Sequence, residues 1–261
     1  MIIFLALSLT FSAKAQQDPH FSMFWNNYSI INPAASGLYY KHQASAQWRH
    51  QSKTTGSEAI TGGYNTKLDF IHGGLGVAYL YEKFGSPTYQ RANLDYSYQI
   101  KLNETNVLSA GIGLGVIYRD YSDWPVSFRP KNETAFAMNL GVVYKNEKLS
   151  VGLSSTQVNM KERDFIIFAD YVLNITPDID LKPRILARAD VKMYGEFSLM
   201  GSFKKQYWLG AGYRSLNTVY FMAGWDIREK FRIGYSYSLT TSKSKLIPRD
   251  THEVVLAFLL K

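Results

Sequence analysis

The stretch Thr105–Tyr118, TNVLSAGIGLGVIY, decides the fold. Side chains alternate between the two faces of a β-strand, and reading every second residue separates two kinds of side chain. One face carries apolar and aromatic residues: Leu108, Ala110, Ile112, Leu114, Val116 and Tyr118. The other face is built mostly of small residues and ends in a charge: Val107, Ser109, Gly111, Gly113, Gly115, Ile117 and Arg119. A strand that crosses a bilayer needs about 9–11 residues, apolar outside and small or polar inside, so this stretch predicts a membrane-spanning strand.

The same alternation recurs along most of the chain and predicts about 14 strands. The segments are 43–49, 60–67, 74–81, 91–100, 105–118, 135–144, 149–153, 165–175, 184–189, 197–199, 207–214, 219–226, 231–240 and 254–260. An even number of antiparallel strands is typical of single-chain outer-membrane barrels. We therefore predict an all-β fold, a transmembrane antiparallel up-and-down β-barrel formed by residues 43–261 as one domain.

The composition agrees with a barrel and excludes several kinds of site. Of the 261 residues 46% are hydrophobic and 15% aromatic, yet the mean hydropathy is −0.19, as expected where half of each strand faces a lumen. Cysteine is absent, which excludes disulfides and thiol chemistry. The net charge of +8 is spread over strands and loops, so charged lumen and loop residues near anionic lipid are favoured over nucleic-acid binding.

Two segments precede the first predicted strand. Residues 1–15, MIIFLALSLTFSAKA, have the apolar run and the Ala-x-Ala ending of a secretory signal peptide, and we expect cleavage before Gln16. Residues 16–42 mix aromatic side chains with Asn, Ser and Pro and show no clean alternation. They are too apolar for a solvated tail, so we expect a plug or periplasmic segment packed in or under the barrel.

The connections between strands differ in length at the two ends of the barrel. Short connections are expected around 103, 146–148, 204–205 and 228–230, and long ones at 82–87, 120–133, 157–164 and 241–250. Outer-membrane barrels have short periplasmic turns and longer external loops, so this parity places both ends of the barrel chain in the periplasm. The connection 176–181 is expected to be long for a periplasmic turn.

The predicted lumen carries charges of both signs. They are Arg91, Asp95, Arg119, Asp170, Arg184, Arg188, Arg214 and Arg232. Such a set forms either a selective pore or a filled interior of paired charges. The glycine-rich faces and the aromatic N-terminal segment favour a filled or narrow lumen. A passive porin remains an alternative function, which a large stable conductance in planar bilayers would support.

A second alternative is a lipid-modifying barrel esterase. His50 and Ser52 lie on one face of a strand, and Glu58 lies across the first hairpin, so they could act as base, nucleophile and orienting carboxylate. A polar strand end explains the same residues, and we predict no catalytic residues and no enzyme. The alternating glycines are no phosphate loop. Asp120, Asp123, Glu133 and Asp164 are assigned to long loops, but no Ca²⁺-loop pattern accompanies them, so neither a metal nor a cofactor is predicted.

Short motifs at the two ends of the chain resemble a known family. They are Asp18-Pro19-His20-Phe21-Ser22, Asn32-Pro33-Ala34-Ala35-Ser36-Gly37, Trp48-Arg49-His50-Gln51 and, in the last strand, His252-Glu253. This pattern is similar to that of the PorP/SprF outer-membrane proteins of the type IX secretion and gliding systems of Bacteroidota. The chain ends Phe258-Leu259-Leu260-Lys261, where many barrels end on an aromatic residue.

The resemblance implies a non-enzymatic role in the outer membrane. Partners would be a secreted adhesin carrying a type IX C-terminal sorting domain, periplasmic ring and motor components of the machinery, and outer-membrane lipid. We expect the long external loops to grip the sorting domain, and the N-terminal aromatic segment and periplasmic turns to contact the machinery. The candidate partner-binding residues are Asp120, Tyr121, Asp123, Trp124, Phe128, Phe21, Phe24 and Trp25.

Overall fold

The computed structural model describes most of the chain. The described residues are 19–52, 57–84, 88–123, 126–160, 163–189, 193–215, 217–241 and 250–261. The predicted signal peptide and its cleavage site lie outside them. Over the described ranges, no helix is both long and apolar enough to cross a membrane.

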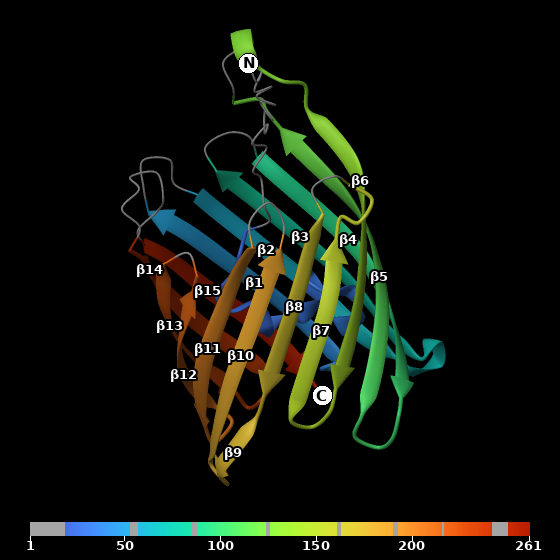
Figure 1. Cartoon of the computed structure of the whole chain (residues 1–261), viewed down its shortest axis with the longest axis vertical. Coiled ribbons are helices and arrows are strands. Elements are labelled where there is room, and N and C mark those ends of the chain that lie inside the picture. Colours follow the sequence, from blue (N-terminus) through green and yellow to red (C-terminus); the bar gives the residue numbers. More distant parts are fainter. Residues whose placement is uncertain are drawn as a thin grey trace, which may run out of the picture.

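The described chain is built almost entirely of antiparallel strands (Figure 1). They are β1 (His42–Ser52), β2 (Ser57–Leu68), β3 (Gly73–Phe84), β4 (Thr88–Lys101), β5 (Val107–Asp120), β6 (Glu133–Lys145), β7 (Leu149–Thr156), β8 (Asp164–Tyr171), β9 (Leu173–Thr176), β10 (Ile179–Ala189), β11 (Met193–Phe203), β12 (Tyr207–Arg214), β13 (Thr218–Ile227), β14 (Phe231–Thr240) and β15 (Asp250–Leu260).

The strands close into a barrel of 14 strands with one short extra strand. Apart from β8 and β9, each strand pairs with its neighbour in sequence, β15 pairs with β1, and β10 bridges β8 and β11. The extra strand arises because the predicted segment 165–175 is interrupted at Val172, and both pieces, β8 and β9, pair with β10. The predicted fold class and the predicted strand number are therefore confirmed.

The two faces of β5 behave as their sequence predicts. Leu108, Ile112 and Leu114 are exposed on the outside, whereas Ser109 and Ile117 are fully buried. The expectation of a small or polar interior is only partly right. Several inward side chains are apolar, among them Val143, Phe168, Met200, Met222 and Val255. They are apolar because they pack against aromatic residues of the N-terminal segment rather than against water.

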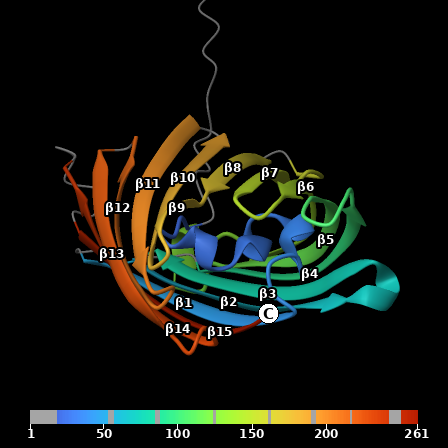
Figure 2. The same cartoon turned by 90° about the horizontal axis from the view of Figure 1, so that it is seen from below.

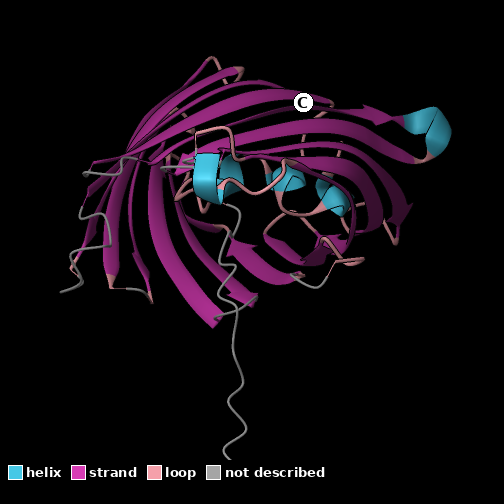
Figure 3. Cartoon of the chain, turned by 90° about the horizontal axis from the view of Figure 1, so that it is seen from above, coloured by secondary structure: helices cyan, strands magenta, loops and turns pink. Residues whose placement is uncertain are grey.

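The N-terminal segment lies inside the ring of strands (Figures 2 and 3). It contains three short 3₁₀ helices, η1 (Phe24–Asn26), η2 (Tyr28–Ile30) and η3 (Pro33–Ala35). The side chains of Asn27 and Asn32 cap η2 and η3 by accepting backbone N–H bonds. Below, residues 19–41 are called the plug. The expectation that this region packs in the barrel is confirmed.

The long connections, 121–132, 157–163 and 241–249, all lie at one end of the barrel, which also has short ones. The expected long connection at 82–87 is wrong, because β3 continues to Phe84 and β4 begins at Thr88. The connection after β9 spans only residues 177–178, so the expected long turn at 176–181 is wrong, because β10 begins at Ile179. Two further 3₁₀ helices, η4 (Asp69–Ile71) and η5 (Val126–Phe128), lie in the connections β2–β3 and β5–β6. The short-turn end, with the start of β1 and the end of β15, is called the inner end, and the other the outer end.

The plug runs from the outer half of the lumen down to the inner end. Arg49, in the outer half of β1, donates to the carbonyl of His20 at 2.7 Å. Gln43, at the inner end of β1, donates to the carbonyl of Asn26 at 2.5 Å. The chain therefore descends alongside β1 in the opposite direction and turns back into the sheet at His42.

A charge placed on the outer face of β5 tests the position of the membrane. We expect Leu114→Arg to lower the free energy of unfolding by about 2–4 kcal/mol, because Leu114 lies at the middle of the strand and would expose a guanidinium to hydrocarbon. Leu102→Arg, in the exposed turn between β4 and β5, is the matched control. Chemical unfolding from lipid vesicles measures both, and equal costs would contradict the membrane placement.

Candidate functional site

The base of the plug is fixed by hydrogen bonds to its backbone. Wall hydroxyls of Ser97, Ser109 and Ser154 donate to the carbonyls of Ser36, Ala34 and Ile31, at 2.7, 2.6 and 2.7 Å. Buried backbone carbonyls need such partners, and a segment without strands or long helices cannot supply enough of its own. The inward serines of three strands therefore hold the plug at this level.

Asn32 is the central residue of this base. It is fully buried, and its side-chain amide donates to the carbonyls of Val142 and Leu153, each at 3.2 Å. Its side-chain oxygen accepts from the N–H of Ala34 at 3.0 Å. The Asn-Pro-Ala motif thus links β6 and β7 while starting η3.

The glycines of β5 and β6 make room for this base. A Cβ on Gly111 would lie 2.2 Å from the backbone nitrogen of Ala34, and one on Gly141 would lie 2.0 Å from the side-chain oxygen of Asn32. Both distances are below what real Cβ atoms show, so the plug can sit here only against glycine. The glycine face predicted from alternation is the seat of the plug.

Trp25 anchors the middle of the plug. The guanidinium carbons of Arg184 and Arg232 lie 4.4 and 4.9 Å from its ring centre, and its ring meets that of Trp208 edge-on at 5.2 Å. Each arginine has its own acidic partner, Asp170 at 2.9 Å and Asp226 at 2.6 Å. Stacked cations of this kind contribute about 0.5–2 kcal/mol each.

Tyr28 anchors the plug to β8, the strand beside the one that carries Arg184. Its ring stacks on Phe168 with centres 4.4 Å apart, and its hydroxyl donates to the carboxylate of Asp170. Burial raises the pKa of the Tyr28 hydroxyl well above its usual value, with the Asp170 charge acting in the same direction. The phenol therefore remains a neutral donor at physiological pH.

The outer part of the plug enters a buried charge network. The backbone N–H of Ser22 donates to both carboxylate oxygens of Glu253, at 2.8 and 3.1 Å. The contact joins the Phe-Ser and His-Glu motifs, which stand at opposite ends of the sequence. The Ser22 hydroxyl also accepts a hydrogen bond from Arg214 at 3.4 Å.

His20 completes this network. Its Nε2 lies 2.5 Å from Glu196, which also accepts from Arg214 at 2.9 Å and from Tyr220 at 2.6 Å. Burial and the Arg214 charge lower the pKa of His20 to about 4, although Glu196 acts in the opposite direction. The imidazole is therefore neutral at physiological pH and donates Nε2–H to the carboxylate.

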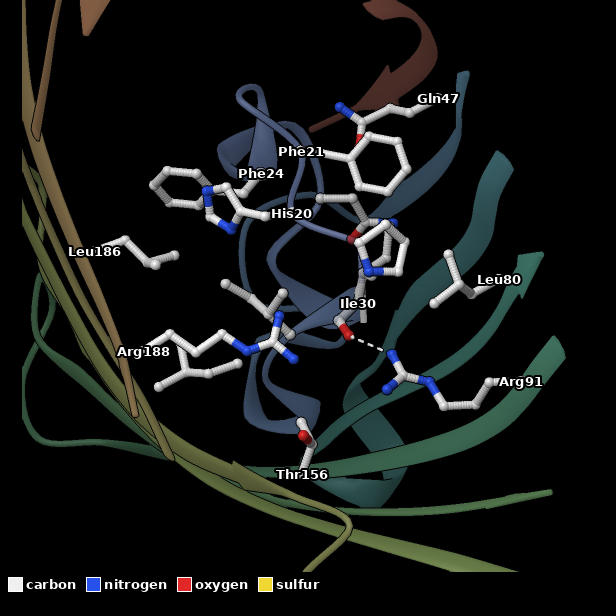
Figure 4. Close-up of a pocket in the computed structure, with 14 residues that line it drawn as sticks. His20, Phe21, Phe24, Ile30, Gln47, Leu80, Arg91, Thr156, Leu186 and Arg188 are labelled. Carbon is white, nitrogen blue, oxygen red and sulfur yellow. Dashed lines mark hydrogen bonds between the residues drawn. The ribbon is translucent and has the colours of Figure 1, made fainter. Parts of the chain in front are cut away.

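A small cavity lies between the outer part of the plug and the wall (Figure 4). The plug contributes His20, Phe21 and Ile30, and the wall contributes Leu80 and Arg188. The volume open to the centre of a water molecule is about 40 Å³, which is room for a few waters. Arg91 donates across it to the carbonyl of Ile30 at 3.4 Å. The cavity is part of the plugged lumen and is too small for an open solute channel.

The structure brings most of the predicted lumen charges into pairs. Arg184 meets Asp170, Arg188 meets Asp164, and Arg119 meets Glu133 at 3.6 Å. Of the two predicted possibilities, a selective pore and a filled interior of paired charges, these pairs support the filled interior. The assignment of Asp120, Glu133 and Asp164 to loops is wrong. Asp120 ends β5, whereas Glu133 and Asp164 begin β6 and β8 and pair with inward arginines.

The predicted partner-binding residues fall into two separate places. Asp120 ends β5, and Tyr121 and Asp123 follow it in the outer β5–β6 connection, where Asp123 pairs with Lys83 at 3.1 Å. Trp124 and the side chain of Phe128 lie outside the described residues. Phe21, Phe24 and Trp25 are at most 7% exposed and pack inside the lumen, so a partner could reach them only if the plug moved. Partner binding by these eight residues stays a prediction.

The esterase residues are only partly brought together. His50 Nδ1 lies 3.4 Å from Glu58 on the outer face, and its ring stacks on Trp48. Within the described chain His50 makes no hydrogen bond to Ser52, so the base and nucleophile are not joined. Among all the residues that the structure describes, there is no cluster of three His, Asp or Glu side chains that could bind a metal ion.

Sequence reasoning missed Glu196 as a site residue. It alternates with the outward-facing Phe197, and this alternation was the available signal. Its role could not be read from the strand alone, because its partners His20, Arg214 and Tyr220 come from distant parts of the chain.

Adding one methyl group to the glycine face tests the seat of the plug. We expect Gly111→Ala to destabilise the seated plug by about 1–3 kcal/mol, because the new Cβ would overlap the backbone at Ala34. Amide hydrogen exchange over residues 19–41 should then speed up by about tenfold or more. In the control Gly201→Ala the nearest atom lies 3.9 Å away, so exchange should not change. Equal exchange in both variants would contradict the seat.

Known outer-membrane barrels share the fold. Omp33 of Acinetobacter baumannii superposes with a TM-score of 0.54 at 12% identity, covering 86% of this chain and 100% of that one. The toluene transporter TodX of Pseudomonas putida gives 0.56 at 9% identity, covering 88% and 92%. A FadL homologue of Pseudomonas aeruginosa gives 0.54 at 10% identity, covering 89% and 94%. At such identities the likeness shows the fold alone.

The family, in contrast, is shown by sequence. A comparison with curated proteins finds no match. The sequence model of the type IX secretion system membrane protein PorP/SprF matches residues 13–258, nearly the whole chain. With the closed barrel, this match places the protein in the outer membrane and in association with type IX secretion. The chain belongs to the PorP/SprF family of type IX secretion system membrane proteins.

Proposed function

We propose that the protein helps to export or anchor one particular secreted adhesin, which it recognises through the adhesin's C-terminal sorting domain. The barrel acts as an outer-membrane accessory of the type IX secretion and gliding machinery. Family membership supports the secretion context. The observation that carries the proposal is the plug, which fills the lumen and is bonded to the wall along its length.

The plug supports a holding role over a conducting role. A porin needs a continuous aqueous path, whereas here aromatic side chains and paired charges occupy the lumen. Moving the plug would break its bonds to Glu253 and leave buried charges unpaired, which is costly. A rigid, closed barrel is suited to present loops to a partner on either side of the membrane.

The connections at the outer end of the barrel are the proposed binding site for the sorting domain. The β5–β6 connection is long and begins after Asp120, the last residue of β5, with Tyr121 and the acidic Asp123. Asp120 accepts from the N–H of Ser122 at 2.9 Å, and Asn132 accepts from the N–H of Tyr121 at 2.9 Å. These bonds order both ends of the connection, which limits the entropy lost on binding.

The inner turns are the proposed contact with periplasmic ring or motor components. The turns at the inner end carry exposed apolar residues, with Phe70 78% and Leu102 55% exposed. Aromatic and aliphatic side chains in such places are common anchors of protein interfaces. Contact through Phe21, Phe24 or Trp25 would need a rearrangement of the plug.

Loss of the gene tests the proposal in cells. We expect the cognate adhesin to disappear from the cell surface and to accumulate in the periplasm or the medium, because its sorting domain loses its holder. Immunoblots of surface, periplasmic and medium fractions measure this. An adhesin that is still exported and anchored at the wild-type level would contradict the proposal.

A loop variant separates recognition from loss of the barrel. The double substitution Tyr121→Ala with Asp123→Ala should reproduce the adhesin defect while the barrel remains in the outer membrane. Met193→Ala, at the outer end of β11 and 81% exposed, is the control and should keep the adhesin at the surface. A large stable conductance of the wild-type protein in planar bilayers would instead support the passive porin.

A further inference from the structure

A second cavity opens at the inner end of the barrel, below the plug. Its volume open to the centre of a water molecule is about 240 Å³, several times that of the outer cavity. Tyr39 and Tyr40 of the plug and Lys145, Lys182 and Lys205 of the wall line it. Figure 2 views the barrel from this end. The plug anchors Trp25 and Tyr28 also line it, but the three lysines take no part in the plug contacts described above.

The lining of this inner cavity is strongly cationic. Six cationic and three acidic side chains line it, an excess of three positive charges. Arg184 and Arg232 are already paired with Asp170 and Asp226. The excess therefore belongs to the four lysines Lys145, Lys148, Lys182 and Lys205. The one remaining carboxylate of the lining is the exposed Glu147, and the charge of Asp180, two residues before Lys182 on β10, also acts on Lys182.

Two of these lysines are partly buried and make no ion pair within the described residues. Lys145 ends β6 and Lys182 lies near the start of β10, and both are half-buried. Neither ammonium has an ion-pair or hydrogen-bond partner in the described part of the chain, and the closest aromatic contact of Lys145 is the Tyr39 ring at 5.9 Å. Partly buried ammonium groups are costly unless an anion compensates them.

The lining and position of the cavity indicate which class of anion could bind there. Lys145 and Lys182 line the cavity inside the lumen mouth, on the side of the barrel wall that faces away from the lipid, so lipid headgroups around the barrel are poorly placed to bind them. Tyr39, Tyr40 and Trp208 supply flat apolar surface beside the lysines. A lining of aromatic rings and ammonium groups suits the Asp and Glu side chains of a polypeptide, which carry carboxylates on short apolar methylene stems.

We propose that this inner cavity binds an acidic peptide segment of a periplasmic protein, with Lys145 and Lys182 receiving its carboxylates. This inference makes the proposed function more specific. It rests on that function in one respect, namely that the inner end of the barrel faces the periplasm. It assigns a chemical class to the periplasmic contact: a segment rich in Asp or Glu, bound in the mouth of the barrel. The site is independent of the adhesin and of the outer loops.

Peptide binding to the purified full-length barrel in detergent tests the site. The probe is a fluorescent hexaglutamate peptide at low ionic strength, with hexaglutamine and inorganic phosphate as comparison ligands. We expect saturable binding of hexaglutamate, little binding of hexaglutamine, and weak competition by phosphate. The double variant K145Q/K182Q should bind hexaglutamate about tenfold more weakly, because two partly buried ion pairs are lost.

A matched variant controls for net charge. K101Q/K230Q removes two exposed lysines at the same end of the barrel but outside the cavity, and its affinity should stay within about twofold of the wild type. Equal losses in the two variants, or no binding, would overturn the site. Binding of phosphate with no preference for the peptide would overturn the peptide as occupant.

The outcomes also separate this inference from the proposed function. An adhesin defect on gene loss without peptide binding would overturn the acidic-peptide site alone. Normal adhesin anchoring on gene loss, with peptide binding intact, would overturn the proposed function alone. Circular dichroism and heat-shifted mobility on gels show whether each variant still forms the barrel, so that a loss of binding is assigned to the lysines.

Discussion

The structure depends on the close contact between the plug backbone and the glycine faces of β5 and β6. Gly111 and Gly141 let Asn32 and Ala34 approach the sheet until wall groups reach the plug's carbonyls. Any side chain at these glycines would push the plug inward, away from the serine hydroxyls. The closed lumen, the aromatic anchors and the outer charge network all require the plug to lie at this depth.

The plug also explains why this barrel has an apolar lining in places. A water-filled barrel needs polar inward residues, but here Trp25, Tyr28 and their neighbours meet Phe168, Met222 and Val255. The lumen is therefore a protein core enclosed by a membrane wall. Its buried charges are accommodated because each arginine that stacks on Trp25 also has a carboxylate. Hydrophobic packing and ion pairing thus stabilise the same closed state.

The fold could be predicted from the sequence because lipid imposes a strict pattern on each strand. The alternation in 105–118 gave the inward and outward faces of β5 correctly, residue by residue. The strand boundaries were predicted less well. The structure begins β10 at Ile179 rather than near Arg184, because Lys182 and Pro183 interrupt the alternation of apolar and polar residues in the sequence. The site was harder to predict. The Ser22–Glu253 and His20–Glu196 contacts join residues far apart in the chain, and a strand pattern contains no information on which distant residues meet.

The two ends of the barrel are chemically different, and this difference follows from where the plug lies. Its outer part brings His20 and Ser22 to the acidic residues Glu196 and Glu253, so the charges there are neutralised inside the wall. At the inner end the plug turns back into β1, and the lysines of β6 and β10 remain beside a cavity. Because the plug occupies the lumen, a partner can bind only at the two ends of the barrel. Because the lining of the inner cavity holds an excess of positive charge, electrostatic attraction favours acidic partners on that side of the membrane.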